Sequence, residues 1–359
     1  MKEKRMEECH MDFFADNKAA LSAFAVMSQA VGARSDYVQG GGGNTSVKLK
    51  DGKMAIKASG FKLSDIREDE AYAVLDYASL REFYNTHEAD EFEDVEKAGS
   101  DRAKELTLTV EGLKALRPSV EAGFHSLLDT YVSHSHSVYA NLAACSVNAK
   151  EIVNELAKET DYAIGFVPYT NPGAKLTFSI RDEIRAVEAA TGKRPAVIFM
   201  QNHGVIATHD DANECLRIHD DINERAKAYF AAGNFPKIEL NGKFSATAGL
   251  KERLSSGRFG ESELLTNPLY PDQMVFFADT LFITDEAPAE GKASLKSDGT
   301  VEYNMDANKA FVLEETLAAI VYIIDGIEAK GLTVSTMSGA AQQFISGWES
   351  EKYRKSMIR

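Results

Sequence analysis

Two strand-like segments that end in histidines most strongly constrain how this chain can fold. His134 and His136 lie two residues apart in the stretch that begins at Tyr131, so in a strand both imidazoles leave the same face. A third imidazole, His203, follows the apolar run 196–200, which is typical of a buried strand, and precedes Gly204, which lets the backbone turn. The three side chains can converge on one ion. Three neutral nitrogen ligands with an open fourth position favour a catalytic divalent metal, zinc first, with manganese or cobalt also accepted.

The histidine pattern alone is weak evidence, because histidines on strands are more often ordinary polar or core residues. A glycine run at 40–43, followed by Asn44, Thr45 and Ser46, strengthens it. Backbone amides in such a turn form an anion-binding concavity, and the next side chains add donors, which suits a phosphate. A flexible hairpin or linker is the alternative. A second turn of small residues, at 59–60, follows a strand-like segment and can face the same phosphate.

A segment that begins with proline supplies a candidate acid/base. Pro118 fixes the entry to a helix, Ser119 is placed to cap it, and Glu121 then falls in the first turn. A carboxylate there is commonly just a favourable partner of the helix dipole. Near a metal site, a role in general acid/base catalysis is the more specific alternative. His125 shares the helix face of Glu121, and we interpret it as a structural histidine.

The composition indicates a soluble enzyme of a reducing, cytoplasmic compartment. With 359 residues, 44% of them hydrophobic, the chain can bury one large core and a smaller second one. The net charge of −15 argues against nucleic acid or an anionic membrane as a partner, so phosphate binding must be local. Three widely spaced cysteines do not indicate a disulfide framework. The N-terminus lacks the apolar core of a signal peptide, and the longest apolar run, 317–324, predicts a buried helix rather than a membrane span.

Hydrophobic periodicity predicts an α/β arrangement. Apolar residues at helical spacing over 13–31 precede strand-like pieces over 47–58, and a long helix is expected at 210–232. We interpret the acidic and histidine residues at 209–211 and 219–221 as helix caps and a solvated face rather than a second metal site.

The character of the sequence changes beyond about residue 237, which divides the chain into a domain over residues 1–245 that carries the candidate catalytic residues and an extension over 260–359. The stretch 257–267 is predicted to be a linker, 270–285 to be strand, and 311–329 and 338–357 to be helices. We expect the extension to pack on the core, to seal a subunit interface or to form a lid over the substrate. No Gly-x-Gly-x-x-Gly fingerprint indicates a dehydrogenase.

These motifs occur in the order seen in the class II aldolase/adducin family, which the chain resembles from about residue 12 to about residue 232. The resemblance includes the segment 166–173, between the histidine pair and the third histidine. It implies a three-layer α/β/α core with a central, mainly antiparallel sheet. Here the core is followed by an α+β extension, as in longer members such as the aldolase part of fused aldolase–dehydrogenase proteins. It also implies a homotetramer.

Resemblance to the rhamnulose-1-phosphate and fuculose-1-phosphate aldolases of this family implies a role for each motif. The expected zinc ligands are His134, His136 and His203. The expected acid/base is Glu121. The residues expected to line the pocket for the substrate phosphate are Asn44, Ser59, Gly60 and Ser119.

The resemblance predicts a zinc-dependent aldolase that cleaves a ketose 1-phosphate to dihydroxyacetone phosphate and an aldehyde such as lactaldehyde. Val120 departs from the fuculose-phosphate aldolase pattern, in which two consecutive serines precede the glutamate, so one phosphate donor is missing or comes from elsewhere. Glu121 argues against the related 4-epimerases, which have an aspartate in its place. The alternatives are a decarboxylase of a 3-oxo acid phosphate, a dehydratase of a ketose 1-phosphate, and a scaffold without turnover.

Overall fold

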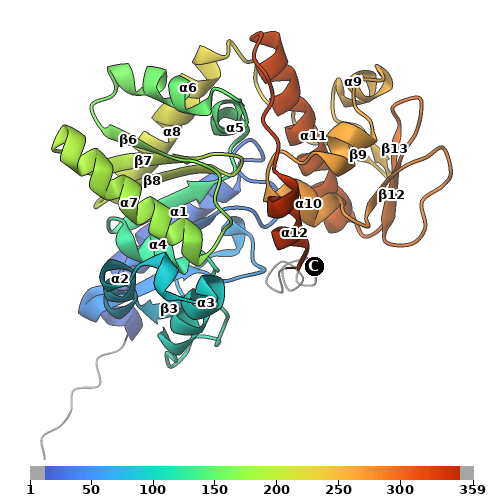
Figure 1. The fold of residues 1–359 in the computed structure, drawn as a ribbon. Coiled ribbons are helices and arrows are strands. Elements are labelled where there is room, and N and C mark those ends of the chain that lie inside the picture. The colour runs from blue at the N-terminus through green and yellow to red at the C-terminus, as the bar shows by residue number, and fades with distance from the viewer. Residues whose placement is uncertain (1–12, 348–359) are drawn as a thin grey trace, which may run out of the picture.

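An eight-stranded sheet forms the centre of the computed structural model, which describes residues 13–347 (Figure 1). The strand order is β4-β3-β2-β1-β5-β8-β7-β6, and all neighbours are antiparallel except β6 and β7. The strands are β1 (Asn44–Lys48), β2 (Lys53–Lys57), β3 (Tyr72–Asp76), β4 (Thr107–Leu108), β5 (Tyr131–Ser135), β6 (Ala163–Val167), β7 (Pro195–Met200) and β8 (Gly204–His209). The expected mainly antiparallel sheet is confirmed.

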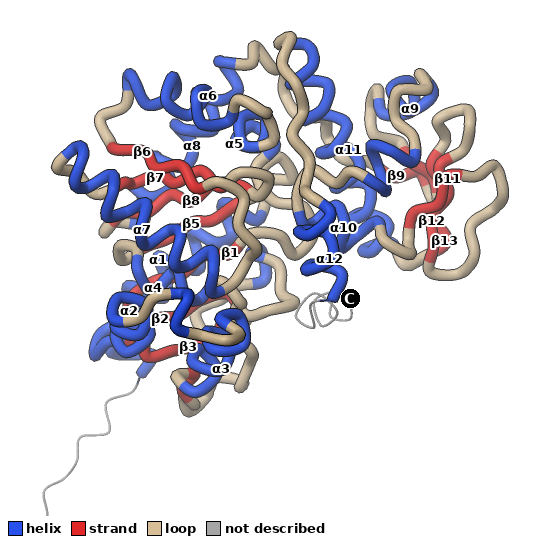
Figure 2. The backbone as a smooth tube through the Cα atoms, in the orientation of Figure 1, coloured by secondary structure: helices blue, strands red, loops and turns tan. Residues whose placement is uncertain are grey.

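Hydrophobic cores lie on both faces of this sheet. Along β7, Val197 and Phe199 belong to one core and Ile198 and Met200 to the other, as the two-residue period of a strand requires. The first core is covered by α1 (Phe13–Gly32), α5 (Val138–Ala144), α6 (Ala149–Leu156) and α8 (Ala212–Tyr229). The second is covered by α2 (Tyr77–Thr86), α3 (Val95–Glu105), α4 (Ala122–Leu127) and α7 (Ala174–Thr191). Figure 2 shows the strands enclosed between helices, which confirms the three layers.

The C-terminal part adds a second sheet, of strand order β11-β12-β13-β10-β9, and a long buried helix. The strands are β9 (Leu240–Asn241), β10 (Phe244–Ser245), β11 (Leu281–Ile283), β12 (Lys292–Leu295) and β13 (Val301–Asn304). The helices are α9 (Leu250–Ser255), α10 (Pro271–Phe277), α11 (Ala307–Ala329) and α12 (Gly339–Gly347). Helix α11 packs against α5 (Figure 1). Its apolar side chains belong to the first core. No helix among residues 13–347 is both long and apolar enough to span a membrane.

Three predictions for the C-terminal part need correction or stay open. The segment 270–285, predicted to be strand, begins with helix α10, because Pro271 occupies its first turn and the apolar residues after it are continuous rather than alternating. The predicted linker 257–267 contains a π-helical turn at Ser262–Thr266 that buries Leu264. The helix predicted at 338–357 is present as α12 up to Gly347, and its remainder lies outside the described residues.

Candidate metal centre

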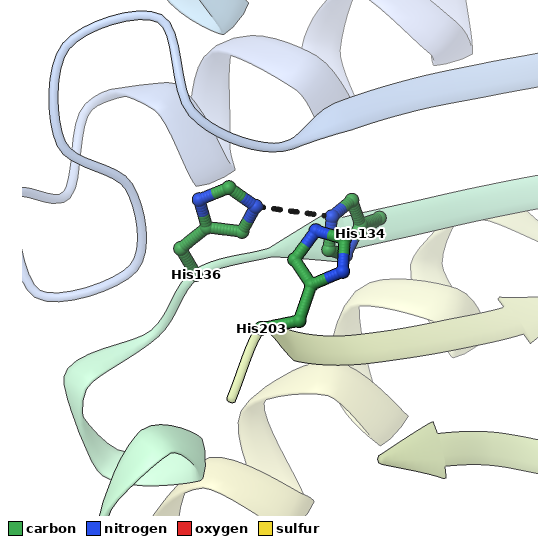
Figure 3. Close-up of side chains that lie close together, drawn as sticks. All are labelled: His134, His136 and His203. Carbon is green, nitrogen blue, oxygen red and sulfur yellow. Dashed lines mark hydrogen bonds between the residues drawn. The ribbon is translucent and has the colours of Figure 1, made fainter. Parts of the chain in front are cut away.

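Antiparallel pairing of β5 with β8 brings the three predicted histidines together. His134 lies opposite Ile206 in this ladder, His136 follows the end of β5, and His203 precedes β8. Figure 3 shows the three imidazoles facing one another, and their ligand atoms lie within 4.8 Å of one another. All three residues are at most 3% exposed. The Nε2 atoms of His134 and His136 are 3.2 Å apart. Two nitrogens bound to one tetrahedral zinc at roughly 2.0–2.1 Å would lie about 3.3 Å apart, so the spacing fits an ion.

The turn before β8 differs from its prediction. Asn202 makes the turn, because its φ of +50° is in the left-handed region, whereas Gly204 has no positive φ. Gly204 is needed for a different reason. A Cβ at this position would lie 2.3 Å from the carbonyl oxygen of Ser135, so a side chain would push β8 away from β5.

Hydrogen bonds orient two of the imidazoles. His134 Nδ1 lies 3.1 Å from the carbonyl oxygen of Val205, and His136 Nδ1 lies 2.5 Å from Oδ2 of Asp272. Each acceptor fixes the Nδ1–H tautomer and leaves Nε2 with a free lone pair. Burial lowers the pKa of His134 well below 6.5, and it lowers the pKa of His203 to about 3. These two imidazoles are therefore neutral near pH 7, as metal ligands must be.

Glu121 faces the same point from helix α4. Its Oε1 lies 3.3 Å from His203 Nε2, and its Oε2 lies 3.6 Å from His134 Nε2. The residue is 6% exposed, and within the described residues Oε1 has no hydrogen-bond partner. Three converging imidazole nitrogens with a buried carboxylate oxygen beside them fit a divalent cation. The predicted cap is wrong in detail, since Glu121 itself occupies the cap position of α4 and Ser119 Oγ accepts its backbone N–H at 3.3 Å.

A chain of hydrogen bonds holds Glu121 in place. The side-chain amide of Asn44 donates to Glu121 Oε2 at 2.5 Å and to Ser119 Oγ at 3.2 Å. His125 hydrogen-bonds to Asn44 Oδ1 through Nε2 and to Ser46 Oγ through Nδ1, the latter at 2.7 Å. Burial lowers the pKa of His125 well below 6.5, so its single ring N–H can donate to the asparagine while Ser46 donates to the other nitrogen. His125 therefore orients Asn44 from within the core.

Three basic side chains hold the other end of helix α4. Lys48 donates to the carbonyl of His125, and Arg81 donates to those of Ser126 and Leu128 at 2.6 and 2.9 Å. Arg194 donates to the carbonyl of Leu127. These side chains line a cavity of about 560 Å³ at the opposite end of α4 from Glu121. Positive charge at a helix C-terminus is stabilising, so we assign the cluster to anchoring α4.

The residues predicted to bind phosphate line one small pocket beside the histidines. An antiparallel bridge between Ala58 and Pro118 and a hydrogen bond from Ser59 N to the carbonyl of Arg117 place the two turns side by side. The pocket is lined by Asn44, Ser59, Gly60, Ser119, Glu121, His136 and His203 and by Gly41, Gly43, Lys57, Val120, Pro172 and Pro271. Its volume is about 50 Å³. Gly43, with a φ of +65°, packs directly on the His134 carbonyl oxygen, which a Cβ would approach to 2.5 Å.

Comparison with known proteins identifies the family. The family model for the Class II Aldolase and Adducin N-terminal domain matches residues 23–230. The chain belongs to the class II aldolase/adducin family. The match includes the three histidines, Glu121 and all four predicted phosphate-binding residues. Pro271 and Asp272 reach the centre from outside it.

Three similar proteins are 18–25% identical to this chain. The chain is 25% identical over 206 residues to the 3-oxo-tetronate 4-phosphate decarboxylase of Haemophilus influenzae, an alignment that covers 54% of this chain and 79% of the relative. A class II aldolase domain of Thermoplasma acidophilum matches with 20% identity and a TM-score of 0.48, over 64% of this chain and 97% of that one. An L-fuculose 1-phosphate aldolase matches with 18% identity and a TM-score of 0.40, over 59% and 84%.

Asp272 is the residue at the centre that the sequence did not reveal. It is fully buried and lies 136 residues from its partner His136. The one local signal is its place directly after Pro271, which marks the start of a helix rather than a ligand.

Proposed function

We propose that this protein is a metal-dependent carbon–carbon lyase, an aldolase that cleaves a ketose 1-phosphate to dihydroxyacetone phosphate and an aldehyde such as lactaldehyde. One observation carries the proposal: the Glu121 carboxylate faces the point on which three buried Nε2 atoms converge. A divalent ion there would be held by His134, His136 and His203. Zinc is the expected metal, and manganese and cobalt suit the same ligands.

Retro-aldol cleavage of the C3–C4 bond leaves its electron pair on C3 of the sugar, while the C4 hydroxyl gives up its proton to water and becomes the aldehyde carbonyl. When bound, the metal would supply the positive charge that stabilises the resulting enediolate oxygens. The released fragment becomes dihydroxyacetone phosphate once that carbon gains a proton. Glu121 would deliver the proton in the cleavage direction and remove it in the synthetic direction. Asn44 would hold the carboxylate in register through the 2.5 Å hydrogen bond to Oε2.

The phosphate would bind beside the metal, where Asn44, Ser59, Gly60 and Ser119 line the pocket. Lys57 lines it too and would offset phosphate charge. Binding energy at this remote group fixes the sugar relative to the reacting bond. A cavity of about 50 Å³ is far below the roughly 300–1,000 Å³ of most ligand sites, so we expect the wall to open for a substrate.

A decarboxylase is the second candidate, because a 3-oxo-tetronate 4-phosphate decarboxylase is 25% identical over 206 residues. Loss of carbon dioxide from a 3-oxo acid also leaves an electron pair beside a carbonyl, so the same charge stabilisation and proton delivery would serve. A ketose 1-phosphate dehydratase would use these groups as well. The products separate the three reactions. Cleavage gives two sugar fragments, decarboxylation releases carbon dioxide, and dehydration leaves the carbon skeleton whole.

The deciding experiment assays purified protein on a panel of ketose 1-phosphates and on 3-oxo acid phosphates. Dihydroxyacetone phosphate and carbon dioxide are the two read-outs. Metal-stripped protein and Glu121→Gln serve as controls, and the substitution should lower kcat by about 10²- to 10⁴-fold. Dihydroxyacetone phosphate from any ketose, lost in both controls, supports the aldolase. Carbon dioxide without dihydroxyacetone phosphate assigns the decarboxylase instead.

The proposal includes a cytoplasmic homotetramer that acts on a small phosphorylated sugar and binds neither nucleic acid nor membrane. The tetramer and the substrate class are those usual for the sugar-phosphate aldolases. The net charge of −15 argues against binding to nucleic acid or an anionic membrane. Light scattering after size exclusion tests the tetramer directly. A monomer with full activity would reject it.

A further inference from the structure

The C-terminal extension reaches the metal centre through Asp272, at the start of helix α10. We propose that Asp272 is a positioning residue that fixes the tautomer and ring orientation of His136, so that the extension is required for tight metal binding. This inference rests on the proposed metal site. It assigns a role to a residue outside the family match, which ends at residue 230.

The geometry places the carboxylate behind the imidazole rather than at the ion. Asp272 Oδ2 lies 2.5 Å from His136 Nδ1, while His136 Nε2 lies 3.2 Å from His134 Nε2. The two ring nitrogens of His136 face opposite ways. Nδ1–H donates to the Asp272 carboxylate, and Nε2 is left to bind the metal. Asp272 is 0% exposed, and His136 is 3% exposed. Water therefore does not compete for this contact.

The segment around Asp272 is tied to the core on both sides of the metal centre. Asn202, the neighbour of His203, donates its side-chain amide to the Leu269 carbonyl at 2.8 Å. The hydroxyl of Tyr270 donates to Gln39, next to the glycine run, at 3.3 Å. The chain therefore meets the ligand loop at 202–203 and the loop before β1 as well as His136. These bonds hold the start of α10 against the site.

A carboxylate that accepts a hydrogen bond from a metal-binding histidine strengthens metal binding. A hydrogen bond from the outer ring nitrogen to an acceptor holds a metal-binding imidazole in one tautomer and raises its basicity, and its loss weakens metal binding by about 10- to 100-fold. Of the two ligands with an Nδ1 acceptor, His134 has a neutral backbone carbonyl and His136 has a carboxylate. Asp272 is thus the stronger of the two restraints.

Zinc affinity, measured by competition with a chromophoric chelator, tests the inference without any assay of turnover. Asp272→Ala should weaken zinc binding by about 10- to 100-fold, and Asp272→Asn, which keeps an acceptor oxygen for Nδ1, should weaken it less. The visible spectrum of the cobalt-loaded protein should change in Asp272→Ala. Asp306→Ala is the matched control, because Asp306 caps helix α11 of the same extension through the Lys309 N–H and touches no metal ligand.

The outcomes separate this inference from the proposed function. Wild-type protein that binds no divalent metal refutes both. If wild-type protein binds zinc, equal affinities in Asp272→Ala and Asp306→Ala refute the positioning role and leave the metal site intact. Complete loss of binding in Asp272→Ala, with Asp272→Asn equally affected, would make Asp272 a direct ligand and also refute it. Graded loss in the order alanine, asparagine, wild type, with normal affinity in Asp306→Ala, supports it.

Discussion

Gly42→Ala tests the packing of the metal centre with a single methyl group. A Cβ built on Gly42 would lie 2.5 Å from Asp272 Oδ2, 2.9 Å from His136 Nδ1 and 3.1 Å from the Gln39 carbonyl oxygen. The first contact is about 1 Å shorter than an ordinary separation of roughly 3.5 Å. Gly42 has no positive φ, so alanine adds no backbone strain of its own. The effect on the folded state must therefore come from the clash, chiefly with the Asp272–His136 pair and to a lesser extent with the Gln39 carbonyl oxygen.

Relief of this clash requires the pair to separate or the loop at 40–43 to withdraw. Overpacking of a tight interior typically lowers the free energy of unfolding by about 1–3 kcal/mol. Because the displaced groups orient a metal ligand, zinc affinity should fall as well, by about 10-fold or more. The two quantities are measured separately, by urea unfolding of the metal-free protein and by chelator competition.

Gly233→Ala is the matched control for this substitution. It also lacks a positive φ, and no atom lies within 4 Å of the Cβ it would add. We expect wild-type stability and wild-type zinc affinity. If Gly42→Ala behaves like Gly233→Ala in both measurements, the packing described around Asp272 is wrong. Lower stability with unchanged zinc affinity would support the clash but show that it does not affect metal binding.

Further predictions concern pH, the anchor of helix α4 and the phosphate pocket. Burial lowers the pKa of His219 from 6.5 to about 4, so in metal-free protein only the unfolded state gains this proton between those pH values. The contribution of His219 to stability should therefore fall by up to about 3 kcal/mol as pH drops from 6.5 to 4, and urea titrations of His219→Asn should show a shallower decline than wild type; equal slopes would contradict this. Arg81→Ala removes two hydrogen bonds to carbonyls at the end of α4, so it should lower stability by about 2 kcal/mol and reduce kcat. Arg185→Ala, in the same cavity, should change neither quantity. Similar behaviour of the two variants would show that Arg81 does not anchor α4. Ser59→Ala should raise KM by about 10-fold with kcat unchanged if Ser59 binds the phosphate, and a fall in kcat instead would place it at the reacting bond.

Much of the core fold could be predicted, because its signals are local in the sequence. Both faces of the sheet are buried, which gives continuous apolar strands such as β7, and the histidines mark strand ends. The three histidines and Glu121 were predicted and lie together. The hydrogen bonds that hold Glu121 were not predicted. They join β1 to α4 across 77 residues of sequence, and only the folded chain brings these elements into contact.

The C-terminal part was harder to predict for an identifiable reason. In segment 271–277 a short apolar run is buried on nearly every side, and such a run has no period that distinguishes helix from strand. The proline that decides in favour of a helix also marks the start of the segment that reaches His136. An error in secondary structure thus hid the position of Asp272.

The contacts of the extension argue against a lid that swings open as a rigid body. Two of its buried carboxylates bond to the core: Asp272 to His136, and Glu315 to the Ser35 hydroxyl at 2.6 Å and to the Gly40 N–H at 3.1 Å. Burial raises the pKa of Glu315, while these hydrogen bonds favour its charged form. A buried carboxylate is tolerated only while its partners remain. Separation would also expose the apolar face that α11 packs on α5. The wall of the pocket that opens for a substrate is therefore expected at the turns around Gly60 and Pro172 in the core domain, and not at the interface with α10 and α11.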